Sequence, residues 1–155
     1  MSGAPPREVT DLLARDHRRL DELFGRFLAA QDREAAGRAI GDFDAALRRH
    51  TELEEEHLYP AAPGGKLSPR AEESERDRLF RELRLEHVQI RELSGMMVRQ
   101  LGGTGGGAAA RGLAANLARR WDAHTSREER EAFPFLERLD PLREAALRKS
   151  LKAES

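Results

Sequence analysis

The sequence predicts an all-α protein, an up-down-up-down four-helix bundle followed by a short C-terminal fifth helix. Three observations lead to this fold class. Ala, Leu, Arg and Glu dominate the 155 residues and aromatic residues make up only 5%, a composition that favours helices. Two stretches rich in helix-breaking residues, "PAAPGGKLSP" at 60–69 and "GGTGGG" at 102–107, divide the chain into helix-sized segments. Between them, apolar residues recur at alternating spacings of three and four, which is typical of bundle helices.

The elements follow from these breaks. Four long helices are expected over about 8–30, 33–59, 70–101 and 108–133. Asp140 followed by Pro141 is typical of an N-cap and a first helical turn, and predicts the short fifth helix over about 140–151. Short links between long helices favour the up-down-up-down order. We expect a single domain over 1–155, with the bundle over about 8–136.

The composition excludes several classes of protein. The net charge is −1, which argues against nucleic-acid binding, since nucleic-acid proteins carry basic surfaces. No window approaches the 18 apolar residues of a transmembrane helix. The N-terminal "MSGAPPREVTDLL" lacks the apolar region of a signal peptide, so a cytoplasmic location is expected. The absence of cysteine excludes disulfides, thiolate catalysis and cysteine-based metal sites.

Polar residues interrupt the apolar seams of the predicted helices. All five histidines lie on these seams, and because only about two positions in seven belong to a seam, chance would place fewer there. The histidines and glutamates of these seams are His17 on the first helix, His50, Glu54 and His57 on the second, His87 on the third, and His124, Glu128 and Glu131 on the fourth.

The chain also carries an internal repeat. With His50 placed over His124, "HTELEEEHLYP" lies over "HTSREEREAFP". With His17 placed over His87, "DHRRLDELFG" lies over "EHVQIRELSG". Each half is therefore one helix with a single His followed by one helix with His-x-x-x-Glu. Two such hairpins would face each other across the core.

This arrangement predicts a metal site. His and Glu four residues apart lie on one face of a helix, so both can reach one metal ion, or the carboxylate can bridge two. A carboxylate in an apolar bundle without a partner costs several kcal/mol, and Glu54 and Glu128 are two of them. A pair of cations would compensate both. Imidazole and carboxylate without thiolate suit iron or manganese, with zinc as a further option.

These motifs resemble those of the hemerythrin-like, or HHE cation-binding, domains. Such domains are four-helix bundles with a non-haem di-iron centre, and the resemblance covers about 8–136. It implies two iron ions, ahead of manganese or zinc, with Glu54 and Glu128 as bridging carboxylates and the histidines as terminal ligands. The positions that match the family motif are His17, His50, Glu54, His87, His124 and Glu128.

One position departs from the family pattern. Oxygen-carrying hemerythrins place His-x-x-x-His on the third helix, whereas the partner positions of His87 are Leu83 and Arg91. The missing ligand is either replaced by His57 or left to water. An open coordination position favours reaction with peroxide or oxygen over simple carriage.

Three further groups of residues surround these candidates. Asp16 and Glu86 are expected to be surface charges, with hydrogen bonding to a ligand as the alternative. Tyr59 and Phe133 are expected to pack at the helix ends. Trp121 is expected in the core, where it could form an apolar wall of the site.

The resemblance implies a protein that reacts with oxygen species, either peroxide in a catalase-like reaction or O2. A non-enzymatic protein that binds or senses O2 or NO is the alternative, so catalysis and binding both remain open. Iron storage ranks third, because its Glu-x-x-His motif fits "EEEH" at 54–57 but not "EERE" at 128–131. A metal-free interaction module ranks fourth. The expected partner is a small molecule (O2, H2O2 or NO), with no nucleic acid and no membrane, and the sequence does not indicate an oligomeric state.

Overall fold

The computed structural model describes residues 8–61, 73–102, 107–138, 142, 144–146 and 148–149. Its four long helices are α1 (Glu8–Ala29), α2 (Arg33–Leu53), α3 (Glu75–Gly102) and α4 (Gly107–Arg127). Two π-helical segments, η1 (Glu54–Leu58) and η2 (Glu128–Ala132), continue α2 and α4, and η2 leads into the short α5 (Phe133–Leu136). The described residues contain no strand, and the all-α bundle is confirmed.

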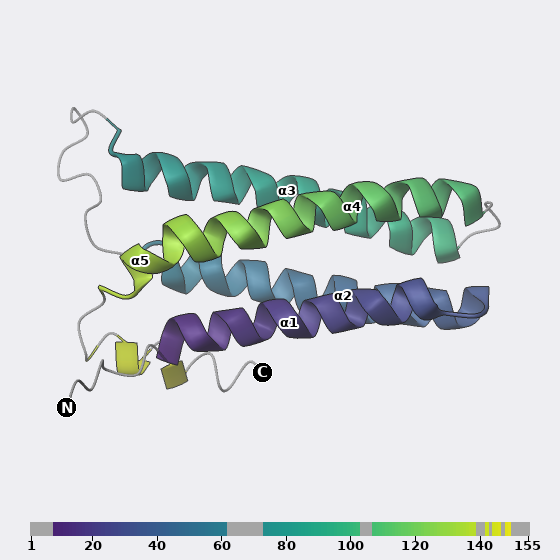
Figure 1. Cartoon of the computed structure of the whole chain (residues 1–155), viewed down its shortest axis with the longest axis horizontal. Coiled ribbons are helices and arrows are strands. Elements are labelled where there is room, and N and C mark those ends of the chain that lie inside the picture. The colour runs from purple at the N-terminus through teal and green to yellow at the C-terminus, as the bar shows by residue number, and fades with distance from the viewer. Residues whose placement is uncertain are drawn as a thin grey trace.

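Consecutive long helices run in opposite directions (Figure 1). The turn between α1 and α2 lies at the same end of the bundle as the C-terminal end of α3 and the N-terminal end of α4. At this end the guanidinium group of Arg33 donates to the carbonyl oxygens of Gln100 (2.9 Å) and Leu101 (3.3 Å). These bonds satisfy carbonyl groups that a helix end leaves without partners, and they connect the two hairpins.

The helix bounds differ from the expected ones in the second, third and fourth helices. The second and fourth helices were expected to be regular to 59 and 133, but both become π-helical, at Glu54 and at Glu128. Residues 62–72 lie outside the described residues, and the described part of the third helix begins at Glu75. The fifth helix expected over 140–151 also lies largely outside them, although its described residues are helical.

The two π-helical segments occupy equivalent positions in the two repeats. In each, the backbone N–H five residues after the glutamate donates to the glutamate carbonyl: Tyr59 to Glu54 at 2.8 Å, and Phe133 to Glu128. This wide turn inserts one extra residue, so every later position is displaced by one relative to a regular helix. Such π turns occur often at functional sites.

The buried apolar side chains form two clusters. One draws on α1, α2, α3 and α4, and the other on α1, α2 with η1, α3, and η2 with α5. The cluster near α5 contains Leu13, Leu58, Phe80, Leu83 and Leu136 among its members. The cluster toward the turn between α1 and α2 contains Phe24, Ile40, Phe43, Leu117 and Trp121 among its members. The candidate histidines and glutamates lie along the helices between the two.

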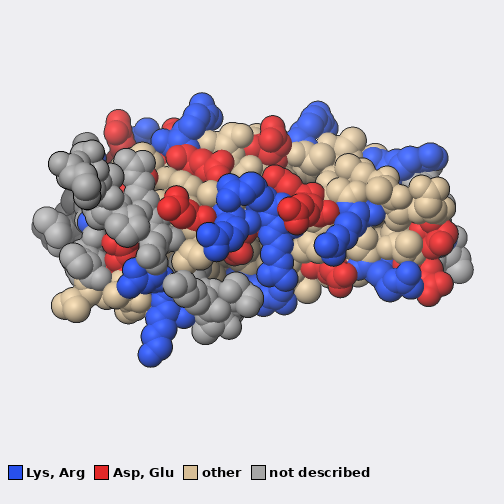
Figure 2. Space-filling model, turned by 60° about the horizontal axis from the view of Figure 1, so that its bottom comes forward, with Lys and Arg blue, Asp and Glu red and all other residues tan. Residues whose placement is uncertain are grey.

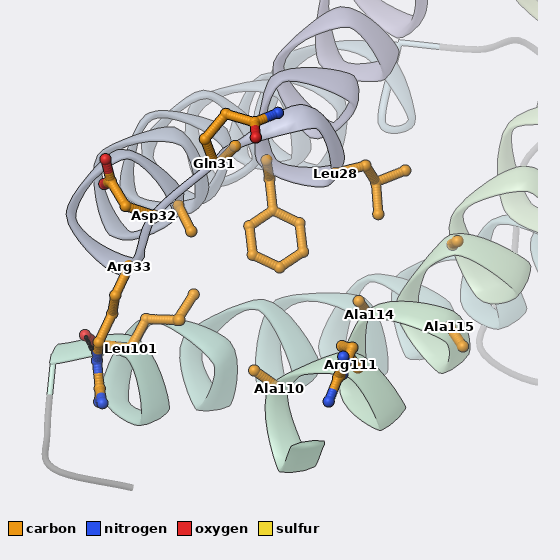
Figure 3. Close-up of a pocket in the computed structure, with 13 residues that line it drawn as sticks. Leu28, Gln31, Asp32, Arg33, Leu101, Ala110, Arg111, Ala114 and Ala115 are labelled. Atoms are coloured by element: carbon orange, nitrogen blue, oxygen red, sulfur yellow. Dashed lines mark hydrogen bonds between the residues drawn. The ribbon is translucent and has the colours of Figure 1, made fainter. Parts of the chain in front are cut away.

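The surface carries mixed charge and one apolar groove. On the face shown in Figure 2, basic and acidic side chains are interspersed. A groove of about 690 Å³ lies at the end where α1 turns into α2, and residues such as Leu28, Ala114 and Ala115 line it (Figure 3). None of the candidate histidines or glutamates borders this groove. Among the described helices, none combines the length and the apolarity that crossing a bilayer requires.

Candidate metal centre

The structure brings six of the predicted residues into one buried layer in the bundle. The single histidines come from α1 and α3, and the His-x-x-x-Glu pairs come from α2 with η1 and from α4 with η2. Each residue is no more than 3% exposed. The six are His17, His50, Glu54, His87, His124 and Glu128.

These residues form two overlapping groups that could each hold a metal ion. One group contains His17 and His50 and the other contains His87 and His124, while Glu54 and Glu128 belong to both. Within each group the candidate ligand atoms lie within 4.8 Å of one another. Because both glutamates are shared, their carboxylates could bridge two cations.

The Nε2 atom of each histidine faces the shared carboxylates. His17 Nε2 lies 2.9 Å from Glu128 Oε1, and the Nε2 atoms of His50 and His87 both lie 3.2 Å from Glu54 Oε1. His124 Nε2 is 3.7 Å from Glu128 Oε2. The structure therefore directs one nitrogen of each ring toward the centre of the layer.

The Nδ1 atom of each histidine faces a carboxylate outside the layer. The pairs are His50 with Asp16 (3.2 Å), His124 with Glu86 (2.7 Å), His87 with Glu55 (3.2 Å) and His17 with Glu129 (3.5 Å). A carboxylate at Nδ1 favours the tautomer with its proton there, which leaves the Nε2 lone pair free for a metal. The four pairs follow the repeat, because Asp16 and Glu86 precede the single histidines and Glu55 and Glu129 follow the shared glutamates.

The expectation that Asp16 and Glu86 are surface charges is wrong, since each accepts a hydrogen bond from a histidine of the neighbouring helix. Arg127 also donates to Glu86 at 2.8 Å. Burial raises the pKa of Glu86, but the hydrogen bonds from His124 and Arg127 outweigh it and hold the pKa below its ordinary value. Glu86 therefore stays ionised and available to orient His124.

Several buried polar atoms of the layer lie close to one another but form no hydrogen bond of acceptable geometry among the described residues. They include His50 Nε2, both carboxylate oxygens of Glu54 and Glu128 Oε1. Burial, and next the nearby Glu128, raise the pKa of Glu54 well above its ordinary value. Unpaired buried polar atoms are costly, and two cations would satisfy these at once. The donor set of imidazole and carboxylate also fits iron or manganese.

His57, the possible seventh ligand, is not brought into either group. Its side chain is 51% exposed, and Glu56 lies 4.0 Å from it. The π turn explains the difference, because the inserted residue gives the inward position expected for His57 to Leu58, which is 0% exposed. The same displacement turns Glu131 outward and buries Ala132.

Tyr59 is a residue of the layer that the sequence interpretation did not assign to it. Its side chain is 0% exposed, and its hydroxyl group donates to Glu128 Oε2. The hydroxyl oxygen of Tyr59 also lies 3.4 Å from His87 Nε2. Burial and the neighbouring Glu128 raise the pKa of the Tyr59 hydroxyl, which therefore stays protonated in the metal-free protein. One signal in the sequence pointed to this residue. Both repeats have an aromatic residue before proline, but only the first, Tyr59, carries a hydroxyl group, whereas the second is Phe133.

Aromatic rings enclose the layer on both sides. The Trp121 ring lies 5.7 Å from His17, 6.2 Å from His50 and 6.1 Å from His124, measured between ring centroids. On the opposite side, the ring of Phe133 stacks on His17 at 6.1 Å. The apolar wall expected from Trp121 is present, and it restricts water near the carboxylates.

Glu86→Gln is expected to destabilise the metal-free protein by about 1–2 kcal/mol at pH 7, through loss of charge-assisted hydrogen bonds. Because the folded-state pKa of Glu86 is depressed, its contribution is present above the ordinary value of 4.5 and is lost as the pH falls through the folded-state pKa. Urea unfolding should therefore show a smaller difference between the variant and wild type at about pH 3. Equal differences at both pH values would contradict this role, and Glu56→Gln controls for the loss of an exposed charge.

A known protein family matches most of the chain. The family model described as the hemerythrin HHE cation binding domain matches residues 8–136. Comparison with curated proteins and with solved structures returned no significant match.

Proposed function

The chain belongs to the hemerythrin HHE cation-binding domain family, and from this membership we propose that its buried layer holds two non-haem iron ions and reacts with peroxide or O2. The observation that carries the proposal is the sharing of Glu54 and Glu128 between two groups that each contain two histidines. A single ion would leave one pair of buried histidines without a purpose. Two ions that share both carboxylates would use all six side chains.

The number of protein ligands at each position supports a reactive iron centre over one whose coordination positions are all filled by the protein. Each group offers two histidines and the two shared carboxylates. Sets of two histidines and few carboxylates with open positions are typical of iron centres that activate oxygen. When bound, two iron ions would supply the redox chemistry, since the pair can accept and return the two electrons that peroxide disproportionation moves.

The protein residues then have distinct tasks. Glu54 and Glu128 would hold both ions, and the outer carboxylates such as Asp16 and Glu86 keep the histidine rings in orientation. Trp121 and Phe133 limit access of water to the layer. Since all six candidate ligands are almost fully buried, only a small molecule such as H2O2, O2 or NO could reach them without rearrangement.

Peroxide consumption tests the catalytic form of this proposal. The iron-loaded protein is expected to release one O2 for every two H2O2 consumed, faster than the same amount of free iron, as followed with an oxygen electrode. Metal-free protein and a Glu54→Ala variant are the controls, and both should fall to the background rate. If the protein holds two iron ions but releases O2 no faster than free iron does, the catalase-like reaction is ruled out.

Reversible binding of O2 or NO is the second candidate, and the burial that limits access to small molecules supports it equally. A reversible change in the visible spectrum of the reduced protein on exposure to gas would distinguish it. Iron storage of the ferritin type is less well supported, because the Glu-x-x-His motif at 54–57 needs His57, which lies outside both groups.

A further inference from the structure

The two candidate metal positions differ in their protein environment. The position of His17 and His50 and the position of His87 and His124 share the same two glutamates. On α3, one turn to either side of His87, Leu83 is packed in the apolar core and Arg91 donates to Glu55 at 2.8 Å. Neither residue therefore supplies a further ligand to the position of His87 and His124.

Tyr59 brings an oxygen atom to the position of His87 and His124. Its hydroxyl oxygen contacts Glu128 Oε2 and lies 3.4 Å from His87 Nε2, and both atoms belong to donor residues of that group. An atom that touches two donor groups of one candidate site lies where a further ligand would lie. No other described residue outside the six donors makes both contacts.

The π turn is what places Tyr59 there. In a regular α-helix, at about 100° per residue, Tyr59 would point roughly 140° away from Glu54. The hydrogen bond from Tyr59 N–H to the Glu54 carbonyl (2.8 Å) widens the turn and brings residue 59 to the inner face. The ring is then held by its packing on Phe80, at 4.7 Å between centroids, and on His87, at 5.8 Å.

The equivalent π turn in the second repeat places Phe133 against His17. Phenylalanine has no donor atom, so this side of the layer gains an apolar ring where the other side gains a hydroxyl group. A cavity of about 460 Å³ borders Phe133 and Glu129, which both contact His17. This side of the layer therefore lacks the extra oxygen and has a cavity behind two residues that contact His17.

We propose that the Tyr59 hydroxyl oxygen is the additional protein ligand of the metal ion held by His87 and His124, so that the ion held by His17 and His50 keeps the position for an external molecule. The inference rests on the proposed di-iron centre. Binding forms one metal–oxygen bond and releases the hydroxyl proton to solvent. A nearby cation reverses the electrostatic preference that keeps the metal-free hydroxyl protonated.

Spectroscopy tests this assignment, because Tyr59 is the sole tyrosine of the chain. The protein loaded with ferric iron is expected to show a tyrosinate-to-iron charge-transfer band in the visible region, with tyrosinate vibrations enhanced in the resonance Raman spectrum. Tyr59→Phe keeps the buried ring and should lose both signals entirely. Phe133→Leu, the matched variant at the repeat position, should keep them.

Metal analysis of the same samples separates the two ideas. Two iron ions per wild-type chain without tyrosinate signals would overturn the assignment of Tyr59 and leave the di-iron proposal intact. Fewer than two ions in wild-type protein prepared with excess iron would overturn the di-iron proposal, and the role of Tyr59 with it.

Discussion

Glu54→Ala is expected to abolish the binding of both metal ions. Its carboxylate belongs to both candidate groups, and its Oε1 lies 3.2 Å from a histidine nitrogen in each of them. Loss of a terminal histidine would weaken one position, whereas loss of Glu54 weakens both. Metal analysis after desalting should show well under one ion per chain, and the visible charge-transfer bands of the bound iron should disappear.

Glu56→Ala is the matched control for this variant. Glu56 lies two residues away on the same helical segment with its side chain 69% exposed, so its removal should leave metal content unchanged. Glu54→Gln separates loss of metal from loss of fold, since it keeps the size of the side chain and removes its charge. If Glu54→Gln bound two ions with wild-type affinity, the bridging role of Glu54 would be wrong.

Removal of the metal is expected to cause the largest change in stability. An ion that binds only the folded state contributes about 4 kcal/mol when its free concentration is a thousand times its dissociation constant, so two ions contribute roughly 8 kcal/mol. For a chain of this size, that difference lowers the midpoint of thermal unfolding by roughly 16–32 °C. Calorimetry of metal-loaded and chelator-treated protein measures it, and a midpoint that chelation leaves unchanged would contradict it.

The effect of Glu54→Gln on the free energy of unfolding should have opposite signs in the metal-free and the metal-loaded protein. In the metal-free protein, burial raises the pKa of Glu54, and this cost is absent below the ordinary value of 4.5 and grows as the pH rises toward the folded-state pKa. The neutral amide avoids the cost, so the variant should be more stable than wild type without metal at pH 7 and less stable with it. A variant that is less stable in both states would indicate a purely structural role.

Much of this site could be predicted from local sequence, and the residues show why. Spacings of three and four residues placed His17, His50, His87 and His124 on inward faces, because helix geometry is uniform over the long regular stretches. The internal repeat predicted in addition that the two helical hairpins face each other across the core. Family membership then confirmed the resemblance over residues 8–136.

The errors all arise where regular helix geometry ends or where helices meet. His57 was placed on the inner seam because the interpretation assumed 3.6 residues per turn, and the π turn at Glu54 gave that place to Leu58. Tyr59 does pack at a helix end, as expected, but the contact of its hydroxyl group with Glu128 was missed for the same reason. The roles of Asp16 and Glu86 depend on histidines from another helix, and no spacing within one helix reports such a contact.

The layer of histidines and glutamates has a further consequence for how the bundle assembles. The apolar clusters on either side of it are built from similar side chains, so apolar packing alone would tolerate a helix that has slipped along its neighbours. A slip of one turn, about 5.4 Å, would carry a fully buried carboxylate such as Glu128 into a layer of leucine and phenylalanine. We therefore expect the polar layer to select a single vertical alignment of the four helices, as a buried polar residue does in a coiled coil. The residues that would hold the cations would also keep the bundle from settling into a neighbouring arrangement.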